Sequence, residues 1–253
     1  MGTNQKSNVQ KKPRDWTVYK VCIAFVMMVL SLMLAHRVLD YYATANGFDV
    51  VYRGSQICVT VCAILCAASA AAFVLLRGKQ VRVVFPYVFV LALLLGLSAL
   101  NLRTYWIEQA TVIYLMHAAV YCLYIIYCLY SSEFFCFSVA TILAGFGFYF
   151  YSKGLGMNAR TAIIAVIVAL VLAAVALLAN RAAKDKGRIK LFGKKFHVFQ
   201  VKFNPTVLYV TCAVLACCLV LSLVLGPAFA YYCMFAAIAI ELIGAVYYTF
   251  QLK

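Results

Sequence analysis

The sequence predicts an all-α integral membrane protein, a polytopic helical bundle of about eight transmembrane helices with both termini in the cytoplasm. Of the 253 residues, 67% are hydrophobic and 11% are charged, whereas a soluble globular domain carries about 25% charged residues. The apolar residues form long continuous stretches, unlike the alternating segments of about ten residues that barrel strands show. Lys and Arg, which give a formal net charge of +15, are concentrated between alternate stretches, as is typical of cytoplasmic loops.

Eight apolar stretches lie between polar segments, and each can cross or nearly cross a hydrocarbon core of about 30 Å at about 1.5 Å per helical residue. Tight turns are expected at Ser131–Glu133 and at Gly226–Pro227, where the connections are shortest. The chain is thus expected to form a single transmembrane domain, residues 1–253. The expected spans cover residues 17–35, 56–76, 82–101, 109–130, 134–151, 161–180, 206–225 and 228–250.

The positions of Lys and Arg predict the orientation. With a cytoplasmic N-terminus, most of the 22 basic residues lie on the inner side, which is the bias that membrane insertion favours. We therefore expect cytoplasmic termini in a plasma membrane or a bacterial inner membrane. Nucleic acid is not an expected partner, because the chain lacks a soluble basic domain with stacking aromatics. The basic residues expected outside are Arg37, Arg53, Arg103, Lys153 and Arg160.

Residues 1–16 form the expected cytoplasmic tail before the first span. A basic segment followed by an apolar one also resembles a signal peptide, but this run ends at Ala35 and His36 without a small-x-small cleavage site. We expect an uncleaved first span.

The eleven cysteines fall within or beside the expected spans, where Cys behaves as a small apolar residue. Cys58, Cys62 and Cys66 recur every four residues on one face of the second span. The alternative is a thiolate path for copper or zinc, but no CxxC pair and no nearby His accompany them. We expect packing here, with no metal and no cofactor.

The fourth expected span carries the most organised polar pattern in the chain. At about 100° per residue, Tyr114, His117, Tyr121 and Tyr124 fall on one face. We call these four residues the Tyr/His stripe. It indicates either a buried helix seam, since buried Tyr hydroxyls need partners, or the wall of a hydrated cavity.

Residues 181–204 form a basic cytoplasmic loop. Apolar and polar residues partly alternate around Gly193–Lys194, which suggests a short β-hairpin. Anionic inner-leaflet lipid would attract the loop by about 1 kcal/mol per basic residue, and an acidic cytosolic protein is the alternative partner. The candidate docking residues are Arg181, Lys184, Lys186, Arg188, Lys190, Lys194, Lys195 and Lys202.

Glu241 is the ionisable residue of the eighth expected span, on a face with small residues at Ala237 and Gly244. Ionisable residues inside a membrane indicate function by default. One interpretation is a proton-carrying site, and the other is a neutral acid that clasps a neighbouring helix. Glu241 and His117 lie at similar expected depths, so we hypothesise that they pair.

The chain shows no phosphate-binding glycine loop, nucleophile elbow or His-Glu zinc pair, and its seven acidic residues are scattered, so we expect no enzyme. The leading hypothesis is a non-enzymatic subunit or scaffold of a membrane complex that docks through its basic loop. The alternative is a small proton-linked secondary transporter that uses Glu241 and the Tyr/His stripe. Both hypotheses leave the oligomeric state open.

Overall fold

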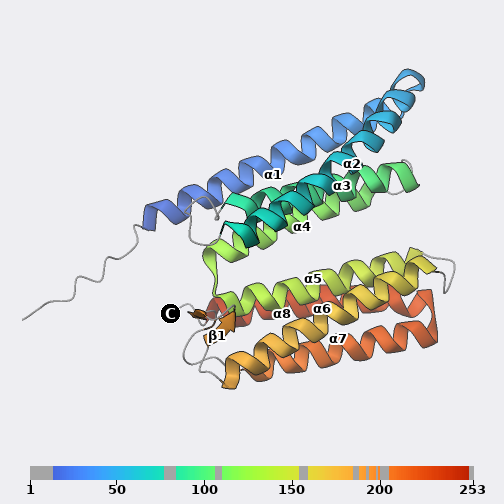
Figure 1. Ribbon diagram of the computed structural model, residues 1–253. Coiled ribbons are helices and arrows are strands. Elements are labelled where there is room, and N and C mark those ends of the chain that lie inside the picture. The colour runs from blue at the N-terminus through green and yellow to red at the C-terminus, as the bar shows by residue number, and fades with distance from the viewer. Residues whose placement is uncertain are drawn as a thin grey trace, which may run out of the picture. The chain divides into compact units, whose positions relative to one another are not determined.

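The computed structural model describes residues 14–76, 84–105, 110–153, 159–184, 188–191, 194–197, 199 and 205–250. This part of the chain holds eight helices that are long and apolar enough to cross a membrane (Figure 1). The predicted all-α class is therefore confirmed, and the chain is a multi-pass membrane protein. The elements are α1 (Arg14–Tyr42), α2 (Ala45–Leu75), α3 (Val84–Tyr105), α4 (Ala110–Leu129), α5 (Ser132–Lys153), α6 (Ala159–Lys184), β1 (Arg188–Leu191), β2 (Lys194–His197), α7 (Pro205–Leu225) and α8 (Pro227–Phe250).

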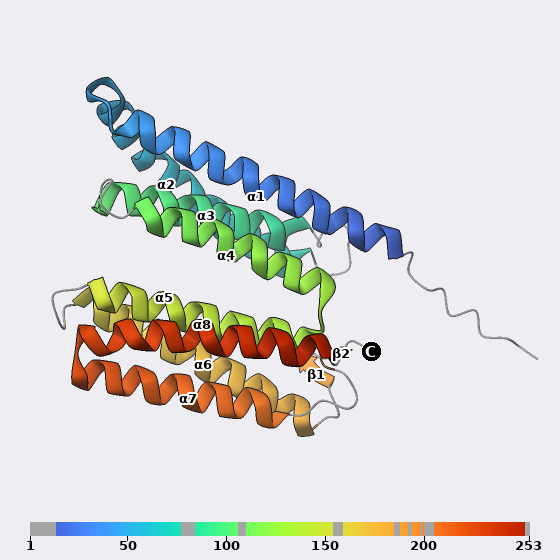
Figure 2. The ribbon, with the colours of Figure 1, turned by 180° about the vertical axis from the view of Figure 1, so that it is seen from behind.

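The chain divides into two compact units, one up to Tyr124 and the other from Ile125 onward. The division falls inside α4, so the first unit holds α1–α3 with most of α4, and the second holds α5–α8 (Figure 2). In the first unit, α2 and α3 pack extensively along each other. A small core joins α1, α3 and α4, and it is formed by Leu39, Tyr42, Leu102 and Ile113.

The turn between α1 and α2 is tighter than expected, since the expected spans stop at residue 35 and resume at residue 56. The helices run on, with His36 and Asp40 paired one turn apart on an exposed face, 3.4 Å from Nε2 to Oδ2. Thr44 then caps α2, because its hydroxyl accepts the Gly47 N–H at 3.1 Å. A Cβ at Gly47 would overlap the Tyr41 carbonyl oxygen, so glycine is required there. Polar residues therefore extend these helices instead of forming a loop.

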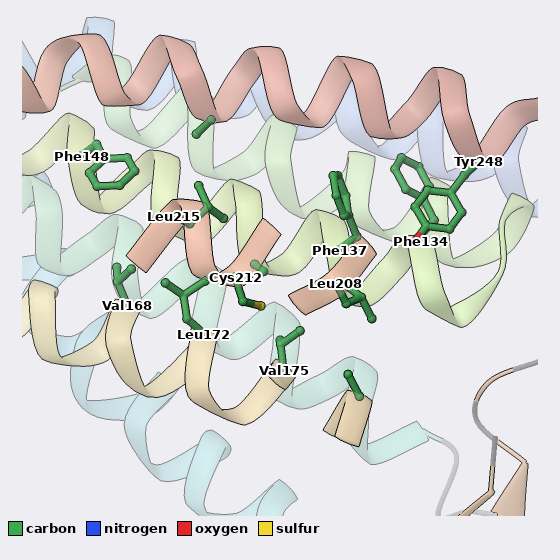
Figure 3. Packing of buried hydrophobic residues seen from close by; sticks show 14 of the residues in the cluster. Phe134, Phe137, Phe148, Val168, Leu172, Val175, Leu208, Cys212, Leu215 and Tyr248 are labelled. Atoms are coloured by element: carbon green, nitrogen blue, oxygen red, sulfur yellow. The ribbon is translucent and has the colours of Figure 1, made fainter. Parts of the chain in front are cut away.

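The core of the second unit is larger and fills the space among its four helices (Figure 3). Rings from α5 and α8 gather at one end, and Phe148 lies at the other. Between them, aliphatic side chains of α6 meet those of α7. The labelled members are Phe134, Phe137, Phe148, Val168, Leu172, Val175, Leu208, Cys212, Leu215 and Tyr248.

Helices α7 and α8 are joined at Gly226, as the sequence predicts. Gly226 adopts a φ of 92°, a conformation that costs little for glycine and more for other residues. Its N–H donates to the Ser222 carbonyl at 2.9 Å, and Pro227 starts the next helix, where its missing N–H is tolerated. One residue thus reverses the chain.

Gly226→Ala is expected to lower the free energy of unfolding by about 1–2 kcal/mol, the cost of a left-handed backbone with a Cβ. No atom lies within 4 Å of the position that the Cβ would occupy, so the loss reports backbone strain alone. Unfolding in mixed micelles with increasing SDS measures it. Gly54→Ala is the control, since Gly54 is helical and also has open space. Equal stabilities of the two variants would contradict the expectation.

The segment between α6 and α7 contains a two-stranded antiparallel sheet, where the sequence suggests a hairpin. The register pairs Arg188 with His197 and Lys190 with Lys195. Basic residues therefore occupy paired positions on both strands.

Candidate functional site

Glu241 on α8 lies against two hydroxyl groups of α5. The Ser138 hydroxyl donates to Oε1 at 2.6 Å, and Thr141 Oγ1 is hydrogen-bonded to Oε2. Ser138 and Thr141 are fully buried, while Glu241 is half-buried. We call these three residues the carboxyl cluster.

Small residues bring α8 close enough to α5 for these bonds. A Cβ at Gly244 would overlap the ring of Phe137, and a Cβ at Gly145 would lie 3.7 Å from that of Ala237. Gly244 and Ala237 are buried, on the same face of α8 as Glu241, three or four residues away from it. The small-residue face that the sequence indicates is therefore a contact face with α5.

The Thr141 hydroxyl lies within reach of more than one acceptor. Its Oγ1 is 3.1 Å from the Phe137 carbonyl oxygen and 3.2 Å from that of Ser138, in addition to the bond with Glu241. The sequence pattern does not single out Ser138 and Thr141 as site residues. The available signal was their spacing of three residues, which places two hydroxyls on one face of an apolar helix.

The Tyr/His stripe contacts side chains of other helices in the first unit. The Tyr114 hydroxyl is 3.1 Å from Nδ1 of His36 on α1, and the ring of Tyr124 meets that of Tyr87 on α3 edge to face at 6.3 Å. Tyr121 is half-buried. At both ends, the stripe therefore takes part in helix–helix contacts.

His117 is the buried member of the stripe. Its Nδ1–H donates to the Ile113 carbonyl at 2.8 Å within the same helix, because a carbonyl oxygen can only accept. The hydrogen bonds of Glu241 go to α5 and that of His117 to its own helix, in different units. The pairing of Glu241 with His117 stays a prediction.

The basic loop residues are only partly described. Arg181 and Lys184 are exposed in the last turn of α6, where positive charge is favourable beside the helix C-terminus. Each strand carries two further basic residues of the loop, whereas Lys186 and Lys202 lie outside the described residues. The strand residues are Arg188, Lys190, Lys194 and Lys195.

Cys58 and Cys62 lie together on α2, with 3.9 Å between their sulfur atoms. Cys62 is buried against α3. A Cβ added at Gly96 of α3 would lie 3.0 Å from the Cβ of Cys62. The Cys66 thiol points to the Phe89 carbonyl on α3 at 3.8 Å. Among the described residues, no group of three His, Cys, Asp or Glu could hold a metal ion. This cysteine face therefore packs α2 against α3.

A small cavity lies among α5, α6 and α7, away from the carboxyl cluster. Its volume is about 10 Å³, close to the minimum for one water molecule. Its lining includes Tyr151, Thr161, Ser222 and Gly147. It is too small for an organic substrate.

A comparison of the chain with protein-family models, with curated proteins and with solved structures finds no match. Function is therefore inferred from the geometry alone.

Proposed function

We propose that the protein is a non-enzymatic subunit or scaffold of a membrane complex that docks through the basic segment between α6 and α7. The observation that carries the proposal is the two-stranded sheet with Arg188 and Lys190 on one strand and Lys194 and Lys195 on the other. A strand pair fixes the backbone positions of basic residues relative to one another, which a flexible loop does not do. Ordered charge complementarity favours specific docking on an acidic surface.

The polar residues of the spans support the same interpretation. Glu241 binds Ser138 and Thr141, and Tyr114 binds His36, so the best-defined polar groups are used between helices. A scaffold needs such contacts to hold its helices together. Anionic lipid of the inner leaflet is the competing target for the basic segment.

Copurification from native membranes tests the proposal. The variant R188Q/K190Q/K194Q/K195Q removes four charges at about 1 kcal/mol each near an anionic surface, so docking should weaken about 1,000-fold. A stoichiometric protein partner is expected with the parent chain, is lost from the variant, and dissociates as salt is raised, since salt screens charge.

The matched control removes four exposed basic residues that lie on other segments, in R37Q/R53Q/R103Q/K153Q. This variant should keep the partner. A partner retained equally by both variants would contradict docking through the strands, as would a stoichiometric loss in the control alone. Binding that anionic vesicles alone reproduce would assign the segment to lipid.

A second candidate function is a small proton-linked secondary transporter. The observation that favours it is the carboxyl cluster, because a half-buried carboxyl with hydroxyl partners inside a membrane span can exchange a proton. Proton uptake into liposomes containing the protein tests it, with Glu241→Gln expected to abolish the flux. A flux unchanged in this variant would exclude Glu241 as the carrier.

A further inference from the structure

The hydrogen bonds of the carboxyl cluster constrain where its protons lie. Ser138 has a single hydroxyl proton, which it donates to Oε1 of Glu241 at 2.6 Å. Thr141 also has a single proton, yet its oxygen lies near Glu241 Oε2 and near two carbonyl oxygens of its own helix. That proton can form one well-aligned hydrogen bond, or a weaker one shared between two acceptors.

Two arrangements give each proton a single acceptor. In the first, Thr141 donates to Oε2 and Glu241 is an anion held by two neutral hydroxyls. In the second, Thr141 donates to the Phe137 carbonyl four residues earlier, at 3.1 Å, which is a common bond for a helical Thr. The bond between Thr141 and Glu241 then needs a proton on Oε2, so the carboxyl is a neutral acid.

The surroundings favour the neutral arrangement. No Lys, Arg or His is paired with Glu241 among the residues that the structure describes. Helices α5 and α7 pack on α8, and their titratable groups in or against this core are Cys136, Cys212, Cys218 and Tyr209. Glu133 is also buried on α5, and α8 adds Cys233 and Tyr248. None of these groups supplies positive charge, and an uncompensated anion in a membrane span is costly.

We propose that Glu241 is a membrane-embedded proton-binding site, and that its bound proton forms the middle one of three consecutive hydrogen bonds. Ser138 donates to Oε1, the Oε2–H of Glu241 donates to Thr141 Oγ1, and Thr141 donates to the Phe137 carbonyl. These three hydrogen bonds join α8 to α5, and none of the groups that form them is charged. Every hydroxyl and the carboxyl proton then have one acceptor each.

Infrared difference spectroscopy on the full chain in lipid nanodiscs at neutral pH tests the site. The spectrum of the parent protein minus that of Glu241→Gln should contain the C=O stretching band of a protonated carboxyl group. A pair of carboxylate stretching bands in its place would overturn the proposal. Because the Gln side chain can accept from Ser138 and donate to Thr141, this variant should keep the thermal midpoint of the parent. A large drop in that midpoint would also speak against a neutral acid.

Ser138→Ala tests the direction of the bonds. Loss of its hydroxyl frees the carbonyl oxygen of the acid, so the C=O band should move to higher wavenumber. Ser222→Ala is the matched control, since Ser222 is equally buried but donates within α7 to the Leu219 carbonyl at 2.8 Å. In the Ser222→Ala variant, the C=O band of Glu241 should keep the wavenumber that it has in the parent protein. A band that Ser138→Ala leaves unmoved would overturn the assigned arrangement.

Discussion

Phe134→Ala is expected to lower the free energy of unfolding of the second unit by about 3 kcal/mol, toward the lower end of the range for a buried Phe. Phe134 is 1% exposed, and its ring centroid lies 4.8 Å from that of Tyr130 and 5.1 Å from that of Tyr248. In a soluble protein, part of this loss is the free energy of moving the side chain out of water. In a membrane that part is absent, because lipid tails are as apolar as the side chain. The lost packing and ring contacts remain.

Unfolding in bicelles followed by a proximity label on α5 and α8 measures this loss. Phe235→Ala is the control, since Phe235 is 49% exposed on α8 and its removal leaves a site that lipid can fill. The control should change stability by less than about 1 kcal/mol. Similar losses in the two variants would show that the aromatic cluster does not stabilise the contact between α5 and α8.

The sequence was sufficient to predict the eight helices, because a span depends on length and apolarity alone. It did not predict that α1 continues to Tyr42 and that α2 begins at Ala45. The pairing of His36 with Asp40 and the cap at Thr44 allow polar residues to continue both helices, and a hydropathy pattern cannot distinguish an exposed helical turn from a loop. The close turn at Gly47 depends on the Tyr41 carbonyl, which is a three-dimensional contact.

The candidate site was partly predictable for a similar reason. Glu241 stands out in any apolar span, and its small-residue face correctly indicated a close helix contact. The sequence could not identify α5 as the neighbouring helix, so Ser138 and Thr141 were missed. Periodicity assigns residues to faces of one helix, whereas a bond such as that between Ser138 and Glu241 depends on which helices meet and at what height.

Gly244→Ala is expected to destabilise the same contact between α5 and α8 by about 1–3 kcal/mol, as overpacking of a filled core does. The added Cβ would overlap the ring of Phe137. That ring is 2% exposed and packs against the rings of Phe134 and Tyr248, at 6.0 and 5.9 Å, so it has little room to move. Gly244→Val should cost more, since it adds two further carbon atoms at the overlap.

The same interface offers a control variant and a test of whether the overlap with Phe137 causes the loss. Gly145→Ala places a Cβ at an ordinary 3.7 Å from Ala237 across the same pair of helices, so it should be neutral or slightly stabilising, because Ala is the better helix former. Phe137→Leu removes the ring atoms that Gly244→Ala would strike. The double variant should therefore be more stable than the sum of the two single losses predicts, with a coupling of about 1 kcal/mol. Strictly additive losses would show that the overlap with Phe137 is not the reason for glycine at position 244, and that α8 can shift away from α5 to accept a methyl group.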